Sequence, residues 1–473
     1  MIFEVLTEDD INQVDKATMD ILANTGVAIY EKQSMQVLEQ AGADIDGARS
    51  RARIPERTIR EALEKAPSRF KLAGRDGRKT VELGSGETYF ANSSSGIKVL
   101  DHSTGSSRES VLADIPMFAR VADALENIHF NGPAVVAHDV KGKLRSLSEM
   151  LAAVENTTKH VGHECQGTEL TKHYIQMAQI IAGGETEFRK NPSVSVGGTP
   201  VSPLQFDGPE TEAMLECARA DMPYDVSSNA MGGGTAPMTL AGELAIINAE
   251  VLTGLTLCQL VNPGSPVIYG NHASIMDTRT EVLALGAPER AILATAVVQM
   301  ARHYGIPSEV GGISTDGKTL GDQAMFEKTM GGLPPVLAGA DIIFGPAVLS
   351  SYTTYSLEQL VIDDEIASAL TRMRKGMNVN QESLAVELID RVGPGGSFAG
   401  IGDTLKHLGI DVWLPVLADR NTEDNWRKEG SESMCSKARK MALDILSNHE
   451  VKPLDQEQKR DIDKVMKAAA KIH

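Results

Sequence analysis

A glycine-rich segment in the second half of the chain has the residue spacing of a phosphate-binding loop. The segment Gly312-Ile-Ser-Thr-Asp-Gly-Lys-Thr319 matches the pattern GxxxxGK[ST] and lies between a predicted strand and a predicted helix. In such loops the backbone N–H groups surround the phosphates, and the lysine reaches the terminal phosphate. Asp316 opposes this chemistry, because its carboxylate would lie among the amides that a phosphate needs.

An acidic segment further along the chain resembles the magnesium-binding strand end of a nucleotide site. Leu360-Val-Ile-Asp-Asp-Glu365 is an apolar run that ends in acids. The same region is also typical of an amphipathic helix, because its apolar residues share one face and Asp363 and Asp364 lie off that face. We favour the helix, and a P-loop NTPase using Gly312–Thr319 remains the alternative function.

The elements that would position this loop alternate between strand and helix. Eight short β-rich segments are predicted, at 128–131, 160–165, 193–199, 224–229, 266–271, 307–312, 341–345 and 396–400. Helical patterns are predicted at 145–158, 169–183, 209–220, 239–261, 288–304, 321–333, 356–375 and 381–391. This alternation is typical of an α/β protein with a (β/α)8 TIM barrel, and an open doubly wound sheet would alternate in the same way.

The segments outside this alternation predict two additions to the barrel. Residues 1–110 combine helical patterns with short alternating strands, including Phe70–Ala73 and Glu87–Ala91, and are expected to form an N-terminal α+β cap. Residues 111–420 are assigned to the barrel. Residues 421–473 are polar and helical, and are expected to form a C-terminal helical extension that wraps the barrel or a neighbouring subunit.

Composition and charge exclude several classes of partner. Hydrophobic residues make up 42% of the chain and the net charge is -18, so a phosphate backbone would be repelled and nucleic acid is not expected. The four cysteines form no CxxC pair, which fits a reducing compartment. The segment Met1–Asp10 lacks the features of a signal peptide, and the apolar pattern Leu240–Val261 is interrupted by Glu243, Asn248 and Glu250. We expect a cytoplasmic protein without a membrane partner.

In a barrel of this kind the reacting groups lie where the strands end and in the loops that follow. The predicted strand ends hold a polar and partly aromatic set with little positive charge: Gln166, Thr199, Asn229, Tyr269, Asn271, His272, Gly312, Ser314, Asp316, Phe344 and Phe398. His160, His163 and Cys165 are close in sequence, but their spacing matches no standard zinc motif, and no metal site is predicted.

Several longer motifs resemble the trimethylamine methyltransferase superfamily. They are Gly198-Thr-Pro-Val-Ser-Pro-Leu, Gly232-Gly-Gly-Thr-Ala-Pro-Met-Thr-Leu-Ala-Gly, Pro263-Gly-Ser-Pro-Val-Ile-Tyr-Gly, Gly321-Asp-Gln-Ala-Met-Phe-Glu, Ser356-Leu-Glu-Gln-Leu-Val-Ile-Asp-Asp-Glu and Asp403-Thr-Leu-Lys-His407. The resemblance spans about residues 8–445. It implies a (β/α)8 barrel that passes a methyl group from a methylated amine to the cobalt of a separate corrinoid protein.

One departure from the family pattern refines the expected substrate. The trimethylamine-specific members carry pyrrolysine, and this chain contains none; its place would fall near Gly311–Asp316. Members without pyrrolysine resemble quaternary-amine demethylases, so the resemblance implies glycine betaine first, and otherwise proline betaine, carnitine or γ-butyrobetaine. It also implies a cognate corrinoid protein, no tightly bound cofactor of the chain's own, and a homo-oligomer. A betaine-binding barrel without catalysis is a further alternative.

A quaternary ammonium group is held by aromatic faces and carboxylates, and the chain offers both after its predicted strands. The expected substrate-binding residues are Asn229, Tyr269, His272, Gly312, Phe344, Tyr352, Tyr355 and Phe398. Asp316 is a candidate to balance the ammonium charge, and His407 lies in a motif that resembles the family. These two residues are the predicted catalytic groups.

Overall fold

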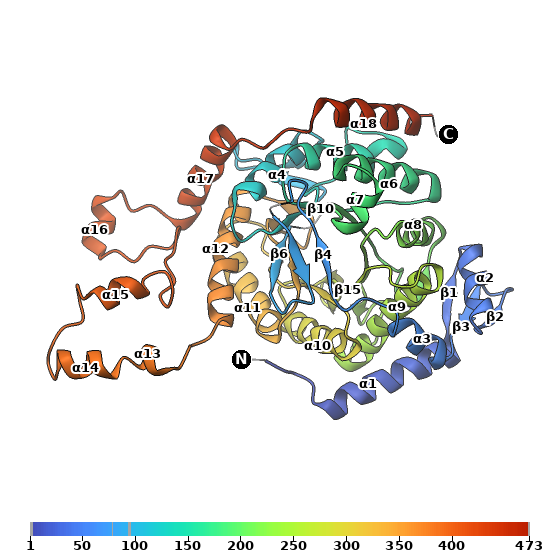
Figure 1. Ribbon diagram of the computed structural model, residues 1–473, viewed down its shortest axis with the longest axis horizontal. Coiled ribbons are helices and arrows are strands. Elements are labelled where there is room, and N and C mark those ends of the chain that lie inside the picture. The colour runs from blue at the N-terminus through green and yellow to red at the C-terminus, as the bar shows by residue number, and fades with distance from the viewer. Residues whose placement is uncertain (1–2, 78, 93–95, 472–473) are drawn as a thin grey trace.

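Eight parallel strands close into a barrel in the computed structural model, which describes residues 3–77, 79–92 and 96–471. Helices surround the barrel on its outside (Figure 1). In order around the barrel the strands are β6 (Tyr89–Ala91), β9 (Phe130–Asn131), β10 (His160–Glu164), β11 (Val194–Gly198), β13 (Tyr224–Ser228), β15 (Val267–Asn271), β18 (Ser308–Gly311) and β19 (Ile342–Phe344). The predicted (β/α)8 class is confirmed.

The strand that closes the barrel is not the one that the sequence indicated. Residues 396–400 were predicted as the eighth strand, but they form no strand and all of them are exposed. The eighth strand is β6, which lies within the segment assigned to the N-terminal cap. It pairs with β19 through Ile343 opposite Phe90 and with β9 through Ala91 opposite Phe130. Because β6 has only three residues and follows a series of equally short strands, its own sequence gave no sign of a barrel strand.

The outer helices are α4 (Asp114–Ala124), α5 (Arg145–Glu155), α6 (Thr168–Ala182), α7 (Glu185–Lys190), α8 (Gly208–Arg219), α9 (Leu240–Val261), α10 (Pro288–Tyr304), α11 (Asp322–Ala338) and α12 (Leu357–Arg374). Seven of the eight predicted helical segments are among them, whereas α4 and α7 were not predicted and the predicted segment 381–391 lies outside the barrel. The apolar helix α9 is long enough to cross a membrane, but 83% of its most apolar stretch is buried inside the protein. The interpretation of this segment as a buried core helix is confirmed.

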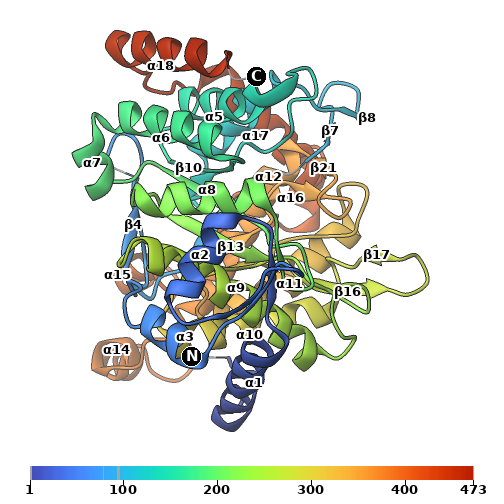
Figure 2. The same ribbon diagram turned by 90° about the vertical axis from the view of Figure 1, so that its right-hand side faces the viewer.

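The N-terminal segment covers α9 from outside. Helices α1 (Glu8–Asp20), α2 (Lys32–Gln40) and α3 (Glu56–Leu63) pack on α9, and a small sheet joins β12 (Gln205–Phe206), β1 (Val27–Ile29), β3 (Arg51–Arg53) and β2 (Asp44–Asp46). Figure 2 shows this cap in blue on the outer wall of the barrel. Helix α9 is therefore apolar on all sides because protein surrounds it on all sides.

A hairpin from the N-terminal segment closes one end of the barrel. Strands β4 (Phe70–Leu72) and β5 (Val81–Leu83) form the hairpin, which lies in front of the barrel in Figure 1. Its buried Leu72, Val81 and Leu83 form one apolar cluster with Phe130 and Ile342 of the barrel interior. The N-terminal ends of the barrel strands are thereby sealed with apolar side chains.

Two small sheets surround the opposite end, where the barrel strands terminate. One contains β20 (Val348–Leu349), β21 (Thr354–Tyr355), β7 (Lys98–Leu100) and β8 (Ser107–Glu109), and the other contains β14 (Met231–Gly232), β16 (Ser274–Asp277) and β17 (Val282–Leu283). We call this end the mouth.

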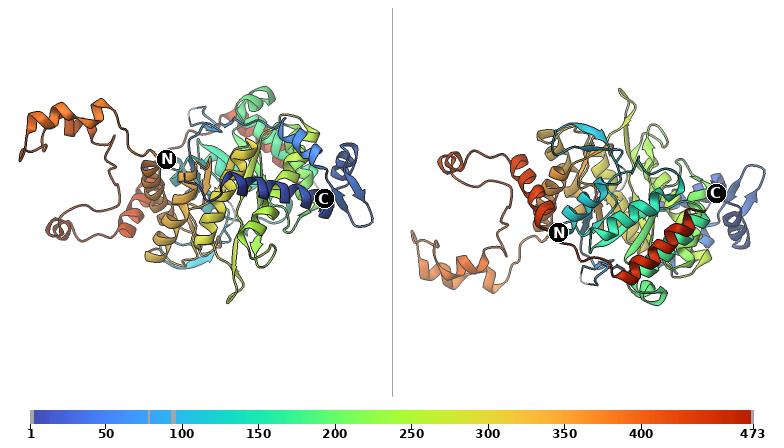
Figure 3. Two further views of the ribbon diagram at one scale, coloured as in Figure 1. Left: turned by 90° about the horizontal axis from the view of Figure 1, so that it is seen from below. Right: turned by 90° about the horizontal axis from the view of Figure 1, so that it is seen from above.

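After α12 the chain leaves the barrel and later returns to it. The excursion contains the short helices α13 (Gln381–Leu384), α14 (Val386–Val392), α15 (Gly402–His407) and α16 (Glu423–Lys428). Figure 3 shows it standing away from the barrel. The helices α17 (Met434–Asn448) and α18 (Gln456–Ala469) then pack against α12, α4 and α6. Part of the segment assigned to the barrel thus lies outside it.

A buried ion pair fixes two loops at the mouth. Lys328 on α11 and Asp363 on α12 have fully buried side chains, and their charged atoms lie 2.8 Å apart. The Lys328 ammonium also donates to the carbonyl oxygens of Ile313 and Gly345, in the loops that follow β18 and β19. Breaking such a pair leaves an uncompensated buried charge.

We therefore expect Lys328→Met to lower the free energy of unfolding by about 3–5 kcal/mol, because Asp363 loses its partner. Urea unfolding followed by circular dichroism measures this change. The exposed Lys375→Met is the matched control, and its unfolding free energy should change by less than about 0.5 kcal/mol. A loss below about 1 kcal/mol for Lys328→Met would mean that the pair does not hold the mouth together.

Candidate functional site

Small side chains inside the barrel leave a cavity at the mouth. Most barrels of this class fill the interior with bulky branched residues. Here the inward positions of two neighbouring strands hold Gly162, Ser195 and Gly197, and Ser227 follows on the next strand. The resulting cavity has a volume of about 170 Å³. The barrel thus has room for a small molecule where the strands end.

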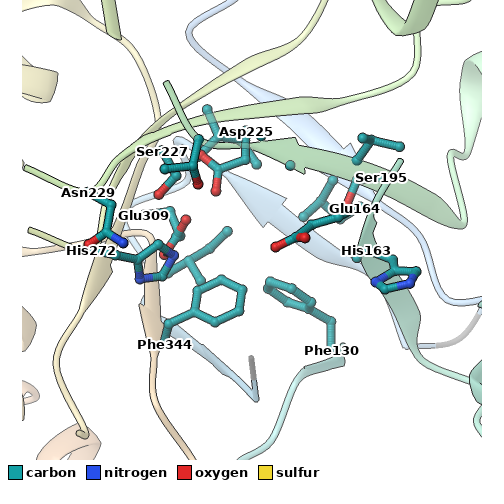
Figure 4. Close-up of a pocket in the computed structure, with 18 of the residues that line it drawn as sticks. Phe130, His163, Glu164, Ser195, Asp225, Ser227, Asn229, His272, Glu309 and Phe344 are labelled. Atoms are coloured by element: carbon teal, nitrogen blue, oxygen red, sulfur yellow. The ribbon is translucent and has the colours of Figure 1, made fainter. Parts of the chain in front are cut away.

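Three carboxyl groups from three strands converge on this cavity. Glu164 lies on β10, Asp225 on β13 and Glu309 on β18, and Figure 4 shows their oxygens turned toward the same space. Gly270 on β15 makes room for one of them, because a Cβ at that position would lie 2.1 Å from Oδ1 of Asp225. Among the described residues, no lysine or arginine lines the cavity. The cavity therefore has a strongly acidic character.

Asp225 and Glu309 are neighbouring carboxyl groups inside the cavity. The pKa of each is raised, which favours a state in which the pair keeps one proton. Burial raises the pKa of Asp225 to about 6. Burial, with the neighbouring charge of Asp225, raises the pKa of Glu309 well above its usual range. Two carboxylates in one buried site cannot both ionise without a large electrostatic cost.

Glu164 is the third acid of the cavity. Its side chain lines the cavity and is exposed to solvent. Desolvation by the surrounding protein raises the pKa of Glu164, the nearby His163 opposes this effect, and the charge of Glu149 adds to it. Glu149 accepts a hydrogen bond from Ala137 N and lies 3.0 Å from His163 Nε2. The acidity of the cavity therefore extends toward the loops that follow β9 and β10.

Aromatic rings form the wall opposite the acids. Phe130 and Phe344 meet edge to face, with centroids 5.7 Å apart, and His272 meets Phe344 in the same way at 5.6 Å. Tyr352 completes this wall, and its hydroxyl lies 3.4 Å from His272 Nδ1. Acids facing aromatic rings are a chemical environment that suits an organic cation.

His272 is neutral in this environment. Burial, together with the positive charge of Arg290, lowers the pKa of His272 to about 3. Its Nε2 lies 3.5 Å from Glu309 Oε1. Arg290 lies outside the cavity lining, donates to Leu285 O and to the Tyr352 hydroxyl, and lies over the Tyr352 ring. His272 therefore adds no positive charge to the cavity.

A wider groove adjoins the cavity at the mouth. Its volume is about 870 Å³, and it shares His163 and Glu164 with the cavity. It is lined by the loops that follow β9 and β10 and by the start of α6, including Cys165, Gln166 and Arg145. The cavity is thus continuous with a surface large enough for a cofactor-sized group.

The structure brings four of the predicted site residues together. Asn229, His272, Phe344 and Tyr352 all line the cavity. Each follows or ends a barrel strand, as the expectation for this fold required.

Six predicted residues lie elsewhere. Tyr269 is buried and donates to Asn248 on α9, and Tyr355 is buried against Phe118. Gly312 donates its N–H to Phe344 O beneath the mouth. Asp316, Phe398 and His407 do not line the cavity either. Asp316 accepts hydrogen bonds from the N–H groups of Leu285 and Gly286. Phe398 is 42% exposed outside the barrel, and Nδ1 of His407 lies 2.5 Å from the Asp411 carboxylate on the excursion.

The residues that give the cavity its charge were not predicted from the sequence. Glu164, Asp225 and Glu309 lie within the predicted strands that form β10, β13 and β18, and Phe130, which was also not named, lies in β9. The available signal was an acid at an inward position of a barrel strand, beside glycine and serine at neighbouring inward positions. An acid has no structural reason to occupy such a position unless it faces a cavity.

The phosphate-loop interpretation of Gly312–Thr319 is wrong. Helix α11 begins at Asp322, after the motif has ended, so the lysine does not open a helix. The loop amides are already used, because the Glu327 carboxylate accepts from Asp316 N and from the Thr315 hydroxyl. Lys318 is exposed and donates to Asp316 O. The acidic run Leu360–Glu365 lies inside α12, as the helical interpretation predicted.

Comparisons with known proteins identify the family to which this chain belongs. A model of the trimethylamine methyltransferase (MTTB) family matches residues 1–471. The trimethylamine methyltransferase MttB1 of Methanosarcina acetivorans is 36% identical over 99% of this chain and 95% of that protein. The glycine betaine methyltransferase of Desulfitobacterium hafniense is 31% identical over 96% of this chain and 95% of that protein.

A solved structure shows the same fold. The crystal structure of the monomethylamine methyltransferase of Methanosarcina barkeri covers 99% of this chain and 88% of that one, with a TM-score of 0.53 and 11% identity. The closed barrel of this chain therefore shares its fold with that protein. The chain belongs to the trimethylamine methyltransferase (MTTB) family, which confirms the resemblance seen in its motifs, and it is an enzyme.

The shared proton makes stability depend on pH. A carboxyl whose pKa is raised on folding binds more protons in the folded protein, so the unfolding free energy falls as pH rises from about 4 through the folded pKa. Glu309→Gln keeps the shape and donates to Asp225 permanently. We expect this variant to be more stable than the parent at pH 8, by about 1–3 kcal/mol, with the difference shrinking toward pH 4.

Urea unfolding at several pH values measures this effect. The exposed Glu64→Gln serves as the matched control and should follow the parent at every pH. A Glu309→Gln variant that is less stable than the parent at pH 8 would contradict the shared proton.

Proposed function

We propose that this enzyme transfers a methyl group from a quaternary amine to the Co(I) of a separate corrinoid protein. The observation that supports this proposal is the cavity itself, in which the acids Glu164, Asp225 and Glu309 face the rings of Phe130 and Phe344. Family membership supports methyl transfer from an N-methyl compound. The absence of pyrrolysine from the sequence separates this chain from the trimethylamine-specific pattern.

The residues of the cavity bind and orient the cation. Phe344 and Phe130 present ring surface to the N-methyl groups, and such contacts contribute about 0.5–2 kcal/mol each. The carboxyl groups balance the ammonium charge in a site with little water. Asn229, Ser227 and the hydroxyl of Tyr352 provide polar contacts for the rest of the molecule. Orientation of one methyl group toward the mouth is the main contribution that this chain makes to the rate.

The reaction requires no general acid from the enzyme. The electron pair of Co(I) forms the new bond to the methyl carbon while the N–C bond breaks and its electron pair stays on nitrogen. A neutral tertiary amine therefore leaves without a proton. The role that remains for Asp316 is positional, because it holds the loop after β18 against Leu285 and Ser351. His407 lies outside the cavity lining and takes no part in this step.

The methyl acceptor has one side from which it can reach the substrate. The hairpin β4–β5 seals the far end of the barrel, and the groove of about 870 Å³ lies beside the cavity at the mouth. A corrinoid protein that docks over this groove would bring its cofactor to the methyl group.

The first experiment mixes the purified enzyme with a Co(I)-corrinoid protein and one quaternary amine at a time: glycine betaine, proline betaine, carnitine, γ-butyrobetaine, choline and tetramethylammonium. Loss of the Co(I) absorbance with at least one of them is expected. No change with any of them, alongside an active partner, would remove the proposal. Calorimetric binding without methyl transfer would favour the non-catalytic binding barrel.

A variant tests the aromatic wall directly. Phe344→Ala removes the ring that faces the acids, and we expect kcat/KM to fall about 3- to 30-fold, which corresponds to the loss of one aromatic contact. Phe3→Ala, an exposed phenylalanine outside the cavity lining, should leave kcat/KM unchanged. Equal rates for the two variants would place the substrate elsewhere.

A further inference from the structure

The proposed function leaves open which quaternary amine enters the cavity, and two properties of the cavity select among them. The first is its size. A cavity of about 150 Å³ holds one benzene molecule, and the volume here is about 170 Å³. A ligand with about five to eight heavy atoms matches this volume, whereas the longer chains of carnitine and γ-butyrobetaine exceed it.

The second property is the sign of the charge. Among the described residues, the lining contains the three acids Glu164, Asp225 and Glu309 and no lysine or arginine. Arg290 lies outside the lining and directs its guanidinium toward Leu285 O and the Tyr352 hydroxyl. A carboxylate on the ligand would therefore lie among carboxyl groups, whose negative charges repel it.

We propose that the enzyme's substrate is a small quaternary ammonium cation without a carboxylate, and that Asp225 and Glu309 are the residues that determine this specificity. This inference rests on the proposed function. The Asp225–Glu309 pair faces Glu164, His272, Tyr352 and Arg290, so a permanent cation is the one ligand charge that every acid in the cavity favours. Glycine betaine fits by size but places its carboxylate among the acids.

The Asp225–Glu309 pair also predicts that a proton is released when the cation binds. A bound cation favours the doubly ionised form of Asp225 and Glu309, so the shared proton leaves to solvent when the ligand binds. Affinity for the cation should consequently rise with pH between about 6 and 8.

Isothermal titration calorimetry on the enzyme alone tests the inference without the corrinoid protein. The probes are tetramethylammonium, choline, glycine betaine and 3,3-dimethylbutanol, which is an uncharged analogue of choline. We expect the two simple cations to bind at least about tenfold more tightly than the other two. Titrations in buffers with different ionisation enthalpies should show proton release with the cations.

Variants of the cavity test whether Asp225 and Glu309 cause the preference for cations. Asp225→Asn combined with Glu309→Gln should weaken tetramethylammonium binding at least about tenfold and abolish proton release, whereas the exposed Glu64→Gln should change neither. Circular dichroism confirms that the double variant folds. Glycine betaine binding as tightly as choline overturns the inference. Methyl transfer from glycine betaine and from none of the simple cations would uphold the proposed function and overturn this inference. Tight binding of the simple cations without any methyl transfer would uphold this inference and overturn the proposed function.

A second inference comes from the excursion that follows α12. Residues 377–410, all of which the structure describes, include no buried side chain. They expose large apolar residues along their whole length: Met377, Val379, Leu384, Val386, Ile389, Phe398, Leu405, Leu408 and Ile410 are each at least 42% exposed. We call residues 377–410 the arm. Monomeric proteins rarely expose a contiguous apolar surface of this extent.

The helices of the arm cannot be stable by themselves. Helices α13, α14 and α15 have four, seven and six residues and bury none of them. Isolated helices shorter than about 12–15 residues are marginal in water, and tertiary contacts provide most of their stability. The arm therefore needs a surface that is present whenever the enzyme is folded.

The direction of the arm is fixed by its base. The Glu365 carboxylate on α12 accepts from the N–H groups of Val416, Leu417 and Ala418, and Trp413 donates to the Ser368 hydroxyl. These contacts hold residues 413–418, where the chain returns to the barrel, along α12. The arm therefore points away from its own barrel (Figure 3).

We infer that the arm packs on a second copy of this chain. In Figure 2, α14 and α15 lie toward the end of the barrel that holds β4, whereas β16 and β17 mark the mouth on the other side. A methyl acceptor must dock at the mouth and leave in every catalytic cycle, so it cannot cover the arm permanently. The arm is longer than the roughly 20–30 residues that one side of a stable interface requires. The barrel wall also exposes Phe326 on α11 and Ile292 on α10, which offer a receiving surface.

Multi-angle light scattering of the full-length enzyme at about 10 μM tests this inference. We expect a dimer or a larger assembly, and Val386→Glu combined with Ile389→Glu should shift the mass to the monomer. Asn378→Glu combined with Gln381→Glu, which adds the same two charges at exposed polar positions of the arm, should not. A monomeric parent enzyme, or an unchanged mass for the double variant, overturns the inference.

Limited proteolysis gives an independent measurement. Trypsin should cut at Arg391 within the arm more than about tenfold faster in the double variant than in the parent, because docking shields this site. Equal cleavage rates in two samples with intact circular dichroism would overturn the inference as well.

Discussion

The closing of the barrel depends on one strand pairing between distant parts of the chain. Ile342, Ile343 and Phe344 on β19 pair with Tyr89, Phe90 and Ala91 on β6. This register places Phe344 and Phe130 on either side of Ala91, with their rings in contact. It also places the β4–β5 hairpin, which precedes β6, across the far end of the barrel. A change in this pairing would open the cavity on the side of its aromatic wall. The geometry of the site therefore depends on a contact between two segments that are far apart in the sequence.

The sequence predicted the repeating part of the fold and failed at its closure. Seven of the eight barrel strands and the helices between them were recognisable because strand and helix patterns alternate with regular spacing. The eighth, β6, was not recognisable, since three residues carry no periodicity and its partners are distant in the sequence. Residues 396–400 were preferred because they follow the last helix, where the repeat would place a strand. Their glycines reflect an exposed connection instead.

The residues named from the sequence include four that line the cavity, whereas no acid inside a barrel strand was named. Asn229, His272, Phe344 and Tyr352 were expected from their positions at strand ends, and they line the cavity. Glu164, Asp225 and Glu309 were missed because strands were treated as scaffold, and Asp316 was preferred because a loop acid is easier to notice. An inward-facing residue lines a cavity only when its neighbours on adjacent strands are small, as Gly270 is beside Asp225. These neighbours can be identified only after the strand register is known.

The apolar hairpin at the far end of the barrel has a kinetic consequence. Since Leu72, Val81 and Leu83 seal that end, a small molecule can enter and leave the cavity through the mouth alone, among the described parts of the barrel. Under the proposed function the methyl acceptor covers the same opening. Substrate and acceptor would then bind in a compulsory order, with the amine first, and the demethylated product would stay trapped until the acceptor departs. Turnover would be limited by the lifetime of the complex between the two proteins, and excess acceptor would inhibit the enzyme by closing empty barrels.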